Sequence, residues 1–90
     1  MGTAAVLAIE EASLISLLER AKKNLPDERG ELVLDFSAVH RIDAAGLRAL
    51  EEFARFSHKK EIQIILRGVQ VDLYKALKLI GLTDQFSFVG

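Results

Sequence analysis

Apolar and polar residues follow two different periods along the chain. Four short segments, rich in apolar residues and bounded by polar or turn-forming ones, are typical of strands and lie at 4–9, 31–36, 61–66 and 86–89. Three longer segments repeat apolar residues every three or four positions, as an amphipathic helix does, and lie at 13–25, 44–58 and 70–80. The pattern therefore predicts strands that alternate with helices.

Residues with strong capping preferences mark the ends of the predicted helices. Ser13 is a suitable N-cap for the first helix, and Pro26 followed by Asp27 is expected to end it. The apolar face of this helix comprises Leu14, Leu17, Leu18, Ala21 and Leu25. Gly81 follows the third helix, at a position where the left-handed conformation favours glycine.

The alternation of strands and helices determines the fold class. Strands separated by helices of this length form βαβ units, whose crossover is right-handed in about 98% of cases. We therefore predict an α/β fold of order βαβαβαβ, in which three helices accompany a small, mainly parallel four-stranded sheet. Because 90 residues are fewer than the usual ~100–200 of a domain, residues 1–90 are expected to form a single domain.

The composition argues against several classes of protein. Twelve Lys and Arg against 13 Asp and Glu leave a formal net charge of −1, which does not favour binding to nucleic acid or to an anionic membrane. The chain has no cysteine, so it has neither a disulfide framework nor a Cys-zinc site. No apolar run approaches the ~20 residues of a membrane span, and no signal peptide is recognisable. We therefore expect a cytoplasmic protein that does not insert into a membrane.

Residues able to support catalysis are few and scattered. His40 and Asp43 share one loop, whereas His58 lies at the end of the second predicted helix, where its positive charge suits the helix dipole. The chain has no Gly-x-Ser-x-Gly nucleophile motif. A phosphate-binding loop needs several glycines between a strand and a helix, and the second helix begins with only one, Gly46. No catalytic residue, metal site or cofactor is predicted.

The segment Asp43-Ala44-Ala45-Gly46, at the start of the second predicted helix, is the most informative. Asp43 is a suitable N-cap, because its carboxylate can accept a hydrogen bond from the amide of Ala45 or Gly46. The small residues leave the helix start uncovered, although glycine costs ~0.5–1 kcal/mol relative to alanine within a helix. Either another molecule approaches the backbone here, or Gly46 lets the helix pack closely against the sheet.

Four segments in combination resemble the STAS domain, a family that occurs in anti-sigma factor antagonists, sulfate transporters and lipid-transport subunits. The segments are Val33-Leu34-Asp35-Phe36-Ser37, Ile42-Asp43-Ala44-Ala45-Gly46-Leu47, Ile64-Ile65-Leu66 and the stretch from Leu77 to Phe86. The resemblance covers roughly residues 12–88. It implies the fold predicted above and a non-enzymatic module that docks onto a protein partner through the start of its second helix.

The resemblance also implies a partner and reveals a departure from the family. In antagonists of this family the partner is an anti-sigma factor that is also a kinase, and it phosphorylates a serine or threonine directly after the motif aspartate. The equivalent position here is Ala44, which has no hydroxyl and cannot be phosphorylated. We therefore predict a docking module without this switch, whose partner contacts Arg41, Asp43, Ala44, Ala45, Gly46 and Arg48.

A second departure concerns the N-terminal part of the sheet. STAS domains usually open with a pair of strands, and only about ten residues precede the first predicted helix here. Either the sheet lacks one edge strand, or a partner or a second copy supplies it. The second alternative includes a homodimer through the exposed sheet edge, because an uncovered edge is a natural pairing site.

Three further interpretations remain open. The chain is alternatively a STAS subunit of a membrane lipid or anion transport complex, bound to its ATPase. Asp35 lies near the carboxyl end of a strand, where ligand sites of α/β sheets collect, although a structural role, in which it hydrogen-bonds the following loop, is favoured. The free amides at the start of the second helix can hold a phosphate, which leaves weak nucleotide binding open without a basic clamp to strengthen it.

Overall fold

The computed structural model describes residues 5–25 and 30–89. Its elements, in chain order, are β1 (Ala5–Ala8), the 3-10 turn η1 (Glu11–Ser13), α1 (Leu14–Lys23), β2 (Gly30–Asp35), α2 (Ala44–Lys59), β3 (Ile62–Arg67), α3 (Val71–Leu79), the 3-10 turn η2 (Thr83–Gln85) and β4 (Ser87–Val89). Four strands alternate with three α-helices, as the sequence predicts. The α/β fold is therefore confirmed.

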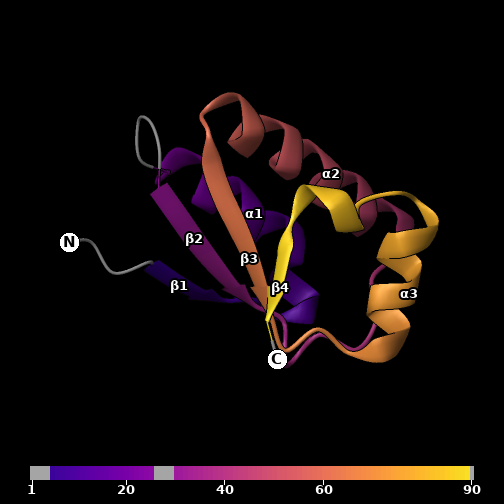
Figure 1. Ribbon diagram of the computed structural model, residues 1–90. Coiled ribbons are helices and arrows are strands. Elements are labelled where there is room, and N and C mark those ends of the chain that lie inside the picture. The colour runs from indigo at the N-terminus through magenta and orange to yellow at the C-terminus, as the bar shows by residue number, and fades with distance from the viewer. Residues whose placement is uncertain (1–4, 26–29, 90) are drawn as a thin grey trace.

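The strands form one sheet in the order β1-β2-β3-β4, and every neighbouring pair is parallel. Each crossover therefore moves one strand further in the same direction. Since such crossovers are right-handed, they place all three helices on the same face of the sheet. Figure 1 shows this arrangement, with α1 and α2 behind the sheet and α3 beside β4.

The alternation of side chains along each strand separates a helix-covered face from an open face. On the covered face, alternate residues of β2 and β3 such as Leu34 and Leu66 are fully buried, together with Phe36 just after β2. The helices add Leu18, Phe53 and Leu77 to the same core. On the open face, residues such as Gln63 and Arg67 are exposed.

Two details at the helix ends differ from the sequence-based expectation. Ser13 precedes α1 as expected, but its side chain makes no capping hydrogen bond, because the chain enters α1 through η1 and the Ser13 backbone, with φ −118° and ψ 17°, is not in the extended conformation of an N-cap residue. Gly81 has φ +76° and follows α3, which confirms the expected left-handed residue there. The predicted strand residue Ala4 and the predicted helix stop at Pro26 and Asp27 lie outside the described residues.

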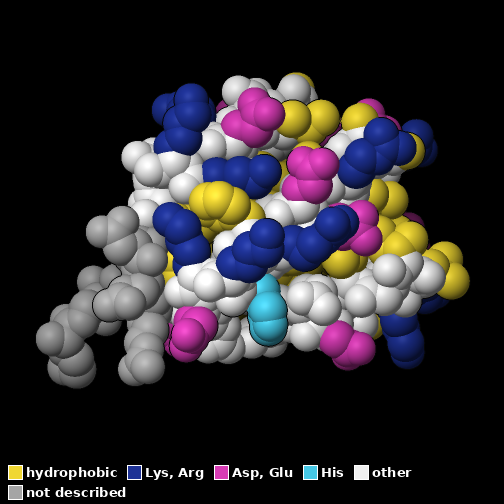
Figure 2. All heavy atoms as spheres, turned by 90° about the horizontal axis from the view of Figure 1, so that it is seen from above, with side chains coloured by type: hydrophobic (Ala, Val, Ile, Leu, Met, Phe, Trp, Pro, Cys, Tyr) yellow, Lys and Arg dark blue, Asp and Glu magenta, His cyan; other side chains and the backbone are white. Residues whose placement is uncertain are grey.

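Basic side chains gather where α1 and α2 end, and Figure 2 views the molecule from above, with Lys and Arg side chains spread over this face. The last turns of the two helices contribute Arg20, Lys22, Lys23, His58 and Lys59. Positive charge at a helix C-terminus is favourable because it opposes the negative end of the helix dipole. Lys22 and Lys60 also lie over the ring of Phe56, at 5.8 Å and 5.1 Å from its centroid. Helix stabilisation therefore accounts for this clustering.

Candidate functional site

Asp43 fixes the start of α2. Its backbone is extended, with φ −89° and ψ 178°, and its Oδ1 accepts a hydrogen bond from the Gly46 N–H at 2.7 Å. The Asp43 carbonyl accepts the Leu47 N–H at 2.9 Å, which begins the regular hydrogen bonding of the helix. This geometry is that of an N-cap residue, as the sequence predicts.

Gly46 is buried, and other residues of the same chain fill the space that a side chain at this position would need. A Cβ at this position would lie 2.8 Å from both Ile42 Cγ1 and Leu14 Cδ2, and 3.2 Å from Asp43 Oδ1. Glycine therefore allows the start of α2 to pack against the start of α1. Of the two roles considered for Gly46, the structure supports close internal packing, but against Leu14 of α1 and Ile42 and not against the sheet as expected.

The other residues of the predicted contact set lie on the surface. Ala44 and Ala45 are exposed in the first turn of α2, and Arg41, Asp43 and Arg48 are exposed around them. The guanidinium groups of Arg41 and Arg48 form no ion pair within residues 5–25 and 30–89. The helix start thus presents two methyl groups and the backbone between two unpaired positive charges.

Glu11 of η1 holds the loop that leads into α2. Its Oε1 accepts hydrogen bonds from the backbone N–H groups of His40 at 2.7 Å and of Arg41 at 2.9 Å. These two bonds, that of Arg41 foremost, lower the pKa of the Glu11 carboxyl below its ordinary value of 4.5. The carboxylate therefore ties together two segments that are about thirty residues apart in sequence.

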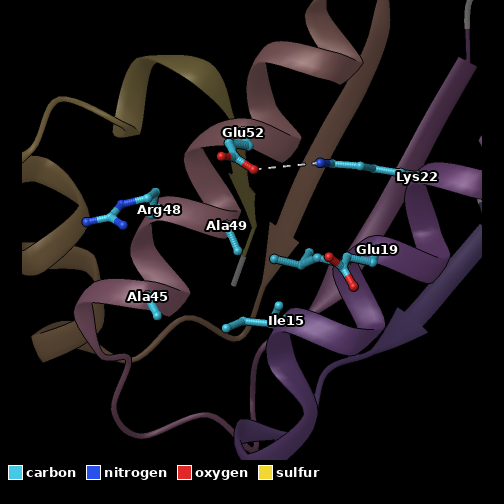
Figure 3. A pocket seen from close by; sticks show the side chains of 8 residues that line it. Ile15, Glu19, Lys22, Ala45, Arg48, Ala49 and Glu52 are labelled. Atoms are coloured by element: carbon cyan, nitrogen blue, oxygen red, sulfur yellow. Dashed lines mark ion pairs between the residues drawn. The ribbon is translucent and has the colours of Figure 1, made fainter.

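A groove separates α1 from α2, and Ala45 and Ala49 line it on the α2 side. Figure 3 shows Ile15 pointing from α1 toward Ala45, while Arg48 points away from α1. The groove has a volume of about 200 Å³ and is bounded further along by the ion pair between Lys22 Nζ and Glu52 Oε2 at 4.0 Å. Ile15 is 41% exposed, so the groove has a partly apolar wall.

A wider, shallow hollow of about 730 Å³ continues this groove toward η1 and the 41–43 loop. Ile15 and Glu19 line both depressions, which joins them into one surface. We call this the α1–α2 surface and define it by its exposed residues, Ile15, Glu19, Arg41, Asp43, Ala44, Ala45 and Arg48.

Asp35 has a structural role at the carboxyl end of β2. Its Oδ1 accepts hydrogen bonds from the Ser37 hydroxyl at 2.7 Å and the Ser37 N–H at 2.9 Å, and its Oδ2 pairs with Arg67 Nη2 at 3.0 Å. These partners, the Ser37 hydroxyl foremost, lower the pKa of Asp35 to about 2. Of the two roles considered for Asp35, it adopts the one that holds the following loop.

The remaining polar residues near α2 do not form a catalytic arrangement. His40 Nδ1 lies 2.8 Å from Gln70 Nε2, a contact that links the loops after β2 and β3. No group of three potential metal ligands occurs within the described ranges 5–25 and 30–89.

Three residues of the α1–α2 surface and its support were missed by reasoning from the sequence. Glu11 and Glu19 gave no signal, because their place depends on how α1 packs against α2. Ile15 did give one, since it is apolar but lies outside the predicted apolar face of its helix. A single apolar residue off the core face is common on protein surfaces, so it did not by itself mark a site.

Comparisons with known proteins agree with this fold. The family model of the STAS domain matches residues 3–89. Among solved structures, a sulfate transporter family protein from Wolinella succinogenes superposes with a TM-score of 0.78 at 24% identity, over 94% of this chain and 75% of that one. The STAS domain of a SulP transporter from Vibrio cholerae gives a TM-score of 0.73 at 22% identity, with coverages of 96% and 73%.

A third similar structure comes from a different assembly. A chain of the stressosome, described as a signal integration and transduction hub, gives a TM-score of 0.70 at 26% identity, over 92% of this chain and 77% of that one. No curated protein matches the sequence. Within residues 5–25 and 30–89, no helix is long and apolar enough to cross a membrane.

Proposed function

This chain belongs to the STAS domain family, and on that premise we propose that it is a non-catalytic interaction module of the cytoplasm that docks onto a protein partner through the α1–α2 surface. The observation that carries this proposal is the exposure of Ala44 and Ala45 in the first turn of α2, where Ala45 lines the groove between α1 and α2. Side chains this small allow a partner to approach the helix backbone closely.

The charges around the alanines indicate the chemistry of the partner. Arg41 and Arg48 are exposed and unpaired within the described residues, so each is free to meet an acidic side chain. Ile15 of α1 lines the groove with Arg48 and the hollow with Arg41, and it offers an apolar contact there. We propose a partner that presents carboxylates around an apolar residue, and we assign it to the class of kinase-like anti-sigma factors. The 26% identity to a stressosome chain supports a signalling role.

Ala44 determines how this docking is regulated. It occupies the position at which the family resemblance places a phosphorylated serine or threonine, and it has no hydroxyl. A phosphoryl group there would add about −1.5 to −2 charges to the contact, and Ala44 cannot carry one. We therefore propose that the module binds its partner constitutively, with regulation residing in the partner.

A second candidate function is a fixed subunit of a lipid or anion transport complex, bound to its ATPase. The structural likeness to a sulfate transporter family protein and to the STAS domain of a SulP transporter favours it. A permanent subunit also has no need of a phosphorylation switch. This candidate uses the same α1–α2 surface.

Binding of purified partners tests both candidates. The genes beside the coding sequence of this chain identify a kinase-like anti-sigma factor or a transporter ATPase, and calorimetry measures its affinity for the wild type. We expect Ala45→Arg to weaken binding at least about a hundredfold, because a long side chain would fill the contact. Gln85→Arg in η2, exposed and of equal charge change, is the matched control.

The result separates the possibilities. Tight binding of the anti-sigma factor that is lost in Ala45→Arg and kept in Gln85→Arg supports the first function, and the same pattern with the ATPase supports the second. Equal affinity of Ala45→Arg and wild type for either partner contradicts docking through the α1–α2 surface. In a companion assay, Ala44→Ser is incubated with the candidate kinase, and phosphate transfer to the serine alone supports the equivalence of this position.

A further inference from the structure

The outer edge of β1 carries none of the side chains that usually protect an edge strand against pairing. Within residues 5–25 and 30–89, β1 pairs with β2 alone and forms one end of the sheet. Natural edge strands are protected by lysine, proline, bulges or short length. β1 comprises Ala5-Val6-Leu7-Ala8, with no charge, no proline and an exposed Val6 at 53%. The opposite edge, β4, has only three residues and is flanked by the contact of Tyr74 with Phe88.

The hydrogen bonds of β1 show which of its backbone groups face outward. The Ile9 N–H donates to the Asp35 carbonyl at 2.9 Å, and Ala8 is the register partner of Asp35. In a parallel pair, the backbone groups of alternate residues point to the same neighbour. Residues 5, 7 and 9 therefore face β2, and the N–H and C=O groups of Val6 and Ala8 face away from the sheet.

The outward N–H and C=O groups of Val6 and Ala8 can form hydrogen bonds with the same groups of a second β1 strand that runs antiparallel to the first. If two β1 strands meet with Leu7 opposite Leu7, then Val6 of each copy lies opposite Ala8 of the other. Each of the two Val6–Ala8 pairs exchanges both N–H···O bonds, and Leu7 forms the non-hydrogen-bonded pair on the two-fold axis. We propose that a second copy of this chain pairs with β1 in this register, which makes one continuous sheet across a symmetric dimer.

The side chains of the open sheet face support this occupant. Val6, Val33 and Ile65 share one row across β1, β2 and β3. In the proposed register, Val6 of one copy lies at the end of this row and meets Ala8 of the other copy, so Val6 gains an apolar neighbour on its exposed side. Because the formal net charge is only −1, electrostatic repulsion between two copies is weak.

The absence of cysteine makes the register directly testable. Directly opposite residues of a non-hydrogen-bonded pair have Cα atoms about 4.5 Å apart, within the range of a disulfide. Under mild oxidation, Leu7→Cys is expected to form a covalent dimer on a non-reducing gel. Val6→Cys and Ala8→Cys, each tested alone, are the matched controls and remain monomeric, because neither residue lies opposite itself. Cross-linking of Val6→Cys in preference to Leu7→Cys overturns the register.

Sedimentation equilibrium tests the dimer without cross-linking. Ala8→Pro removes an outward-facing N–H group that makes no hydrogen bond to β2. Proline requires an extended backbone at the residue before it, and Leu7 in β1 already has one. Loss of one bond per copy is expected to weaken the dimer about tenfold. Circular dichroism confirms that the variant is folded. A wild type that sediments as a monomer up to about 1 mM, or an Ala8→Pro variant that dimerises equally well, overturns the proposal.

Discussion

Gly46 and Leu14 are packed so closely that a Cβ on the glycine would lie 2.8 Å from Leu14 Cδ2. The first turn of α2 and the first turn of α1 therefore fit together only because residue 46 has no side chain. The neighbours of Gly46 on α2, Ala44 and Ala45, face solvent instead. The three small residues therefore have two roles: Gly46 allows close packing inside the protein, and Ala44 and Ala45 leave the helix start open to solvent.

Gly46→Ala is expected to destabilise the fold. Overpacking typically costs ~1–3 kcal/mol, whereas alanine gains ~0.5–1 kcal/mol over glycine in a helix. Because two side chains, Leu14 and Ile42, must both move, we expect a net loss of about 1 kcal/mol. Urea unfolding at unchanged m-value measures it. Ala45→Gly isolates the propensity effect at an exposed neighbour, and a higher midpoint for Gly46→Ala than for wild type would contradict the packing role.

Asp43→Ala is expected to cost about 0.5–2 kcal/mol, the usual range for loss of an N-cap. The variant leaves the Gly46 N–H without its acceptor at the partly buried start of α2. Asp43→Asn retains an oxygen at the same place and should keep most of this stability. Thermal and urea unfolding of the two variants give the comparison. Equal losses in both would show that the charge, and not the hydrogen bond, stabilises the helix start.

Asp35 makes the stability of the fold depend on acid pH. Its pKa of about 2 lies below the ordinary value of 3.8, so the folded state binds this proton less readily than the unfolded state does. Its contribution is therefore present above about pH 4 and is lost as pH falls toward 2. Ser37→Ala removes the main cause and should raise the pKa of Asp35 toward its ordinary value. An NMR titration of the Asp35 carboxyl carbon measures both values, and identical pKa values in wild type and Ser37→Ala would contradict this assignment.

The fold could be predicted because its signals are local. Each strand and helix has its own apolar period, and the right-handed crossover rule then leaves little freedom in how the elements combine. The start of α1 was predicted less well. Ser13 has a capping side chain by type, yet the turn η1 before it leaves its backbone at ψ 17°, outside the extended region that an N-cap residue needs.

The candidate site could be predicted only in part, for a related reason. The cap at Asp43 depends on residues three positions apart and is visible in the sequence. The burial of Gly46 depends on Leu14, and the support of Arg41 depends on Glu11, both about thirty residues away. Such contacts follow from how α1 packs against α2, which no local pattern records. A glycine in the first turn of a helix indicated that another group packs closely against the helix backbone. It did not indicate whether that group belongs to the same chain or to a partner.

Glu11→Ala is expected to loosen the loop before α2 without unfolding the protein. The His40 and Arg41 amides lose their shared acceptor, so their hydrogen exchange should become faster while that of the β2 and β3 amides stays unchanged. Glu10→Ala, an exposed neighbour, is the matched control. Mass-spectrometric exchange of peptides covering 37–46 measures the effect. Since Arg41 belongs to the α1–α2 surface, Glu11→Ala should also weaken partner binding, by less than Ala45→Arg does. Unchanged exchange at His40 and Arg41 would show that the loop keeps its shape without this carboxylate.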